Sequence, residues 1–340
     1  MEILISLFYL FIFPGFLFLS IYGTVLEWIN KKFLAFLHRT TETNLRQFLI
    51  DSARIFSEKD IVPGLGASYL LPFITIASAV TLILLVPVHS NSALSSFRGD
   101  LIVAIYLLAL PAVAGFVISL LSRHSCLNLP ERLAELLLAE VLFLLAVMAP
   151  AVLAGTWNTV EISRFMAEHP MFIFLEIPAF LISLIALQIR LEKIYATNSP
   201  GEQEESAAIF IQPGSFSGTV KISLNMEMLA SAALINAVFL GGSLGTGGLV
   251  GLVLFLLKTA MVSLILSAVN IFLAKAMAKA VEPVKETYPL ASEDNVLAPG
   301  VGQIKTTEGF TNKINLCWKV LFPLALAQII LNAIIKWKLG

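Results

Sequence analysis

The chain has 340 residues, of which 58% are hydrophobic and only 13% are charged, and its formal net charge at pH 7 is -1. This composition leaves too little polar surface to cover a soluble globule, so it predicts an integral membrane protein. The near-neutral charge and the lack of a basic stripe with interleaved aromatic residues exclude nucleic acid as an expected partner.

Apolar segments recur along the whole chain, and each is close to the roughly 20 residues that a helix needs to cross a bilayer. Eight such segments cover residues 3–23, 68–88, 101–121, 133–154, 171–187, 226–240, 247–273 and 320–335. We therefore predict an all-α, polytopic membrane protein that forms one integral membrane domain over residues 1–340. The first segment is expected to be retained, because Glu2 replaces the basic region with which a cleavable signal peptide begins.

Positive charge is distributed unevenly between the two sides of this bundle. Seventeen of the 22 Lys and Arg residues fall in alternate connections, namely those that follow the first, third, fifth and seventh segments. The positive-inside rule makes this side cytoplasmic, and an even number of spans then places both termini outside. The expected location is the inner or plasma membrane.

Three cytoplasmic connections carry features beyond positive charge. Residues 42–60 show apolar side chains at helical spacing with charges largely opposite, which predicts an amphipathic helix along the membrane surface. That helix either lies on lipid headgroups or packs as the lid of an intramembrane cavity. Residues 190–223 and 274–319 are predicted to dock a peripheral protein, although a solvated connector is the alternative for the acidic first of these.

Few ionisable residues fall inside the predicted spans. Glu131, Glu135 and Glu140 follow one another into the fourth span, and Lys258 lies near the middle of the seventh. A carboxylate at such depth is unfavourable unless it is paired, protonated or hydrated, so these residues are functional candidates. A contact between Glu140 and Lys258 is one hypothesis, whereas Glu176 is expected to lie at the outer interface.

The sequence shows no residue pattern for covalent catalysis or for a resident metal. His38, His89, His124 and His169 are scattered over membrane edges and connections, and the two cysteines, Cys126 and Cys317, are far apart. We therefore expect no catalytic residue, no metal ligand and no cofactor in this chain.

Several elements in a fixed order resemble a known family. Within residues 30–63 the element SEKDIVP is the most specific, NSPGEQEE at residues 198–205 is similar to an acidic loop, and NLCWKVLFPLALAQIIL is similar to a last helix. Together they resemble the membrane subunit of the 1/H type, which connects the two arms of respiratory complex I. Its relatives belong to energy-converting NiFe hydrogenases and the membrane-bound sulfane-sulfur reductase.

The positions at which this sequence departs from the family pattern indicate which branch of the family it resembles most. The Gly-Pro element that shapes a quinone entrance is replaced by Thr40, Thr41, Glu42 and Thr43, and Gly214–Gly218 keeps only the Ser-Gly end of a second element. The resemblance therefore favours the hydrogenase or sulfane reductase branch, which does not use quinone.

The resemblance implies a connecting subunit that anchors a peripheral arm and couples its redox chemistry to proton or sodium translocation. Iron–sulfur clusters and a NiFe or other redox centre are expected on peripheral, hydrogenase-like partners, with antiporter-like subunits beside the chain in the bilayer. The implied proton-relay residues are Glu131, Glu135, Glu140, Glu192 and Lys258. The implied docking residues are Asp51, Glu58, Lys59, Asp60, Glu202, Glu204 and Glu205.

Two other classes compete with this hypothesis. A stand-alone secondary transporter is compatible with Lys258, Glu140 and the Gly-rich residues 241–251, but no internal repeat pairs the two halves. An intramembrane prenyltransferase requires paired Asp-rich motifs, which the chain lacks.

The charge asymmetry makes a topological prediction. A cysteine introduced at Ser206 should react with a membrane-impermeant thiol reagent only from the cytoplasmic side, and one introduced at Ser92 only from outside. Labelling of intact cells and inverted vesicles measures this, and the opposite pattern would overturn the orientation.

Overall fold

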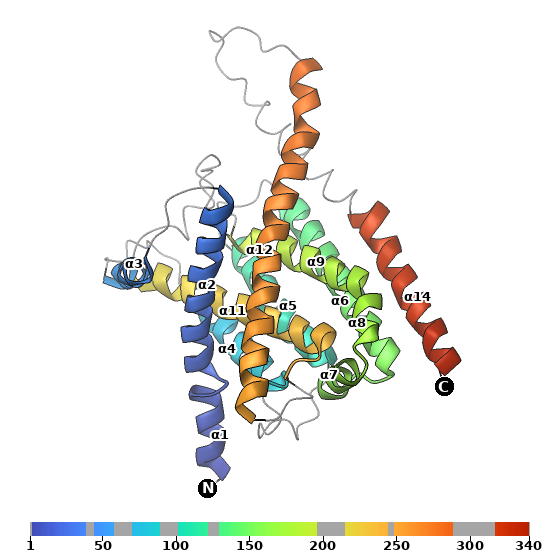
Figure 1. The fold of residues 1–340 in the computed structure, drawn as a ribbon. Helices are drawn as coiled ribbons and strands as arrows, with labels where there is room; N and C mark the ends of the chain where they lie inside the picture. The colour runs from blue at the N-terminus through green and yellow to red at the C-terminus, as the bar shows by residue number, and fades with distance from the viewer. Residues whose placement is uncertain are drawn as a thin grey trace.

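The computed structural model describes residues 2–38, 44–57, 70–88, 101–121, 129–195, 215–243, 248–287 and 317–339, and every regular element over these ranges is a helix (Figure 1). The helices of the first half are α1 (Glu2–Phe11), α2 (Phe16–His38), α3 (Leu45–Ser57), α4 (Leu70–Leu85), α5 (Leu101–Leu121) and α6 (Leu129–Ala154). Those that follow are α7 (Thr159–Glu168), α8 (Met171–Leu175), α9 (Ile177–Tyr195), α11 (Ser215–Leu240), α12 (Gly248–Thr287), the π-helical turn η3 (Cys317–Leu321) and α14 (Phe322–Leu339).

Five helical stretches within the described residues are long and apolar enough to cross a membrane. They are Leu7–Leu37, Leu136–Ala154, Gly218–Leu240, Gly248–Ile271 and Cys317–Lys338. Shorter apolar helices, Leu70–Leu85, Leu101–Ala114 and Ile177–Leu191, coincide with the three remaining predicted spans. The all-α membrane fold is therefore confirmed, while the count of eight spans stays a prediction.

Several boundaries differ from those that hydropathy predicts. Helix α2 continues to His38, so Lys31 and Lys32 belong to a helix and not to the connection that follows it. Helix α9 likewise continues past the predicted end of the fifth span, which brings Arg190 into the helix. The short helix α7 was not predicted, and the predicted span 171–187 is divided into α8 and α9. The side chain of Asn158 caps α7 by accepting hydrogen bonds from the amides of Val160 and Glu161.

Helix α11 occupies the centre of the bundle. It packs against α2, α3, α4, α7 and α12, and it runs obliquely to α2 and α12, from α3 at one end to α7 at the other (Figure 1). Most of its side chains between Met226 and Phe239 are buried, as expected for a helix that is apolar on all faces. Because lipid does not reach these side chains, polar residues on α11 need partners from neighbouring helices.

The amphipathic helix α3 packs against the bundle through Phe48, which is only 5% exposed. The amines of Lys31 and Lys221 lie 4.8 Å and 5.1 Å from the centroid of the Phe48 ring, and Lys221 also donates to the Ser52 hydroxyl at 3.1 Å. Leu49 nevertheless stays half exposed, which suits a helix that also meets lipid. Helix α3 is therefore attached to α2 and α11, while its role as the lid of a cavity stays a prediction.

Replacing Phe48 with Ala should loosen α3 from the bundle. Each of the two cation–π contacts contributes about 0.5–1 kcal/mol at such sites, in addition to the lost apolar burial. Hydrogen–deuterium exchange should therefore accelerate over residues 45–57 in Phe48→Ala. Phe36→Ala is the matched control, since Phe36 is 73% exposed; equal exchange in the two variants would contradict the packing described here.

Candidate functional site

Three buried or largely buried charged side chains lie where α6, α9 and α11 meet. Arg190 of α9 is central: its Nη2 atom is 2.5 Å from Oε1 of Glu227 on α11, and its Nε atom is 3.3 Å from Oε1 of Glu140 on α6. The same Nη2 donates to the backbone carbonyl of Leu108 on α5. We refer to Glu140, Arg190 and Glu227 as the buried charge cluster.

Burial makes charge compensation in this cluster obligatory. The side chains of Arg190 and Glu227 are each 2% exposed and that of Glu140 is 17% exposed. Ions removed from water are tolerated only when they are paired and hydrogen-bonded. One guanidinium faces two carboxylates, so the cluster carries a single net negative charge when both are ionised. Uptake of one proton by either carboxylate makes it neutral.

Part of the hydrogen-bonding capacity of the cluster is unused. Among the described residues, no group forms a hydrogen bond with Nη1 of Arg190 or Oε2 of Glu227. Buried polar atoms normally have partners, and exceptions are concentrated at functional sites or at sites of bound water. Within the described part of the chain, the cluster therefore keeps one donor and one acceptor that could bind a water molecule.

A second polar network joins α11 to α2 just beside the cluster. The Glu27 carboxylate of α2 lies 2.7 Å from the Lys31 amine and 3.4 Å from the Lys221 amine, and it accepts a 2.7 Å hydrogen bond from Asn225 Nδ2. Asn225 precedes Glu227 by only two residues on α11. The Glu27 network and the buried charge cluster thus share helix α11.

Lys258 is not part of the buried charge cluster. Its amine donates to the carbonyl oxygens of Leu240 and Gly242, at 2.8 Å and 3.1 Å, where α11 ends. A cation is favourable at this position because the last carbonyls of a helix lack intrahelical donors. The hypothesised contact between Glu140 and Lys258 is therefore wrong: Glu140 is paired with Arg190, and Lys258 caps α11.

The remaining predicted site residues are placed only in part. Helix α6 carries Glu131 and Glu135, and α9 carries Glu192, but their side chains lie outside the described part of the chain. Asp51, on the exposed side of α3, accepts a 2.9 Å hydrogen bond from Gln47. Outside the described residues are Glu58, Lys59, Asp60, Glu202, Glu204 and Glu205. Their relay and docking roles stay predictions.

Sequence reasoning missed Arg190 and Glu227 as partners of Glu140. Hydropathy assigns Arg190 to the cytoplasmic connection, and Glu227 falls on the second residue of the predicted span 226–240. One signal was present: apolar residues continue beyond the predicted end of the fifth span, at Ile189 and Leu191, both of which are buried. Extending the span over them would have placed Arg190 inside the bilayer.

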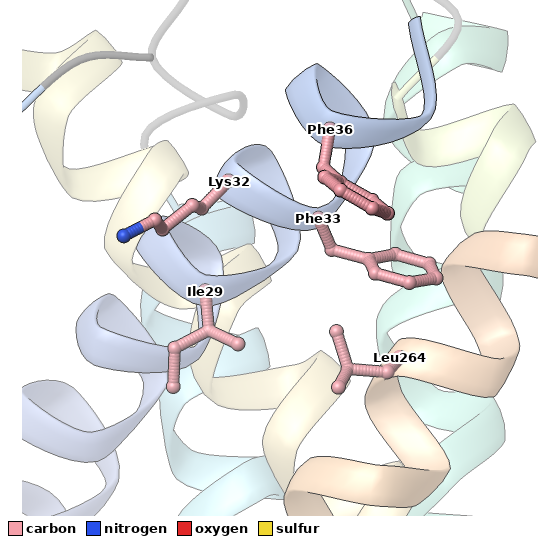
Figure 2. Close-up of a pocket in the computed structure, with 5 residues that line it drawn as sticks. All are labelled: Ile29, Lys32, Phe33, Phe36 and Leu264. Carbon is pink, nitrogen blue, oxygen red and sulfur yellow. The ribbon is translucent and has the colours of Figure 1, made fainter. Parts of the chain in front are cut away.

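A groove lies between α2 and α12. Its lining residues are Ile29, Lys32, Phe33, Phe36 and Leu264, and Figure 2 shows both Phe rings directed toward Leu264 while the Lys32 amine extends away from them. Such walls suit an apolar chain, and none of the predicted site residues belongs to them. Over the described ranges, no three His, Cys, Asp or Glu residues gather in a way that could hold a metal ion.

Removing the central charge should destabilise the protein strongly. Breaking one partner out of a buried ion pair costs about 3–5 kcal/mol, because the remaining charges lose their compensation. We expect Arg190→Met to lower the thermal unfolding temperature of the detergent-solubilised protein, and Arg190→Met with Glu227→Gln to recover part of the loss. Arg164→Gln, at an exposed position of α7, is the control. No recovery in the double variant would show that Arg190 acts through its shape and not through its charge.

Comparison with known proteins agrees with this architecture. The family model described as NADH dehydrogenase matches residues 10–281. The H subunit of NADH-quinone oxidoreductase from Helicobacter acinonychis (strain Sheeba) is 24% identical over 342 residues, covering 93% of each chain. The H subunit of F(420)H(2) dehydrogenase from Methanosarcina mazei is 23% identical over 241 residues, which cover 65% of this chain and 69% of that protein.

A solved structure shares the fold. A chain of the membrane-bound sulfane sulfur reductase, an archaeal respiratory membrane complex, superposes with a TM-score of 0.69 at 20% identity, covering 93% of this chain and 96% of that one. The family match extends from the first helix into α12 and includes every residue of the buried charge cluster. The chain therefore belongs to the NADH dehydrogenase family, with H subunits of respiratory complexes among its relatives.

Proposed function

We propose that this chain is the membrane-embedded connecting subunit of a complex I-like respiratory complex. It anchors a peripheral arm that carries iron–sulfur clusters, and it couples the redox chemistry of that arm to translocation of H+ or Na+. The observation that carries this proposal is the buried charge cluster, in which Arg190 holds two carboxylates from different helices inside the bundle. When both carboxylates are ionised, the cluster carries one net negative charge. It can therefore take up one proton and release it again.

The coupling step follows from the position of α11. An added charge at the docking face perturbs the Glu27 network, because charges in a low dielectric affect one another over longer distances than in water. Asn225 and Glu227 lie on the same rigid helix, so a shift of the network changes the distance between Glu227 and Arg190. The balance between Glu140 and Glu227 then decides which carboxylate holds the mobile proton.

The sequence supports the branch that does not use quinone. Its Thr40 to Thr43 stretch lacks the Gly-Pro element. We place the redox centres, NiFe or other, on peripheral partners, and antiporter-like subunits beside the chain in the membrane. The likeness of the fold to a chain of the sulfane sulfur reductase is compatible with this placement.

We further propose that the basic connections face the cytoplasm of a plasma or inner membrane and that both termini lie outside. Docking then falls to α3 and to the acidic connection after α9. The docking residues are Asp51, Glu58, Lys59, Asp60, Glu202, Glu204 and Glu205. The family assignment favours this function over a stand-alone secondary transporter, for which Lys258 was an argument. The structure uses Lys258 to cap α11 and so weakens that argument.

Replacing the titratable groups tests the coupling role. Glu140→Gln and Glu227→Gln keep the shape of the side chain and remove its proton, so each variant should assemble and retain most electron transfer to an artificial acceptor. Ion translocation into vesicles should fall by roughly tenfold or more, as for loss of a proton-transferring side chain.

The control is Glu161→Gln, at an exposed position of α7 where Glu161 accepts a hydrogen bond from Thr156. Electron transfer and translocation should both match those of the unmodified complex. Full translocation by both Glu140→Gln and Glu227→Gln would remove the buried charge cluster from the pathway and leave Glu131, Glu135 and Glu192 as candidates.

A further inference from the structure

A third buried carboxylate, outside the buried charge cluster, lies where α6, the α8–α9 junction and α14 meet. Glu176 is the residue between α8 and α9 and is only 1% exposed, so protein encloses it, while its predicted position at the outer end of the fifth span stays a prediction. Asn332 of α14 donates to Oε1 of Glu176 at 2.5 Å and to the carbonyl of Ala149 at 2.9 Å. Figure 1 shows α14 at the edge of the bundle, beside α6 and α8.

The carboxylate of Glu176 has no charged partner among the described residues. Its Oε1 atom is hydrogen-bonded to a neutral amide, and its Oε2 atom is buried and accepts no hydrogen bond from any described group. A buried anion without compensation is strongly unfavourable, so this position requires a bound cation or a proton. In this respect it differs from Glu140 and Glu227, which share Arg190.

Several oxygen-bearing groups surround Glu176. Gln328, one helical turn before Asn332, donates to the carbonyl of Leu175 at 2.9 Å and lies 3.4 Å from Oδ1 of Asn332. Rotation of a side-chain amide by a half turn exchanges its nitrogen and oxygen, so both amides can direct oxygen instead of nitrogen toward this space. Together these residues supply one carboxylate, two amide oxygens and the main-chain carbonyls of Ala149 and Leu175.

The local backbone is interrupted in a way that suits an ion. Leu175 ends α8, so its carbonyl lies at a helix terminus. Pro150 lies within α6 and has no amide donor, and the carbonyl of the preceding Ala149 accepts from the Asn332 amide. Pro178 adds a second position without an amide donor at the start of α9. Carbonyls at interrupted helices within membranes coordinate small cations. A cation such as Na+ uses several oxygen ligands, whereas a proton needs only one oxygen atom.

We propose that Glu176, Asn332 and Gln328, with the carbonyls of Ala149 and Leu175, form a binding site for a dehydrated Na+ ion. The site is independent of the proton relay and of the proposed coupling function, because its residues lie outside the buried charge cluster and the Glu27 network. Binding neutralises Glu176 and ties α14 to α6 and α9.

Thermal unfolding of the full protein in its solubilised assembly tests the proposal. NaCl should raise the unfolding temperature above the value in choline chloride or KCl at the same ionic strength, because a ligand that binds only the folded state stabilises it. Glu176→Gln should abolish this Na+-specific shift. Asn332→Ala should raise the NaCl concentration that gives half of the shift by roughly tenfold or more, as for loss of a group that orients a metal site.

Chemical labelling locates the ion. Dicyclohexylcarbodiimide reacts with protonated carboxyl groups in membranes, and NaCl should protect Glu176 from it in the unmodified protein, as read by mass spectrometry of the peptide that carries Glu176. The control Gln47→Ala changes an exposed amide of α3 and should leave both the thermal shift and the protection unchanged. Labelling of Glu176 that is equal with and without NaCl, or a Na+-specific thermal shift that persists in Glu176→Gln, would overturn the proposal; the first result would identify a site for protons only.

Discussion

The ion pair of Arg190 with two carboxylates is the interaction on which the interior of this protein depends. It draws α6, α9 and α11 together, and the additional hydrogen bond to the Leu108 carbonyl includes α5. In a bundle built mostly from apolar helices, such a pair is retained despite the desolvation that it demands. Its arrangement of one cation between two anions leaves room for a single mobile proton, which links the stability of the core to its proposed function.

Helix α11 connects this interior to the face where α3 lies. Within a few residues it carries Lys221, which contacts Phe48 and Ser52 of α3, then Asn225, which binds Glu27, and then Glu227. Neighbouring helices enclose α11, so its polar groups find partners in protein and not in water. We propose that α11, held near α3 and at its buried carboxylate, moves as one body. This rigidity is the physical basis on which we propose long-range coupling.

The fold class and the family could be predicted from sequence because long apolar segments and ordered motifs are local signals. Partners could not. Arg190 falls in a predicted loop because hydropathy ends a span at the first charges, although the apolar pattern continues through Leu191. Lys258 caps a helix end formed by residues that precede it in the chain, and Glu176 is buried by α14, more than 150 residues later. Such contacts depend on which helices become neighbours in the fold. The pattern of apolar residues along one helix carries no information about that.

Infrared difference spectroscopy of the assembled complex, recorded between its oxidised and reduced states, tests the central claim most directly, because a carboxyl group that changes protonation gives a difference band in its C=O stretch. We expect such a band in the unmodified complex, reduced in Glu140→Gln and in Glu227→Gln and retained in Glu161→Gln. A spectrum that is identical in all four proteins would contradict the assignment of the redox-linked proton to the buried charge cluster.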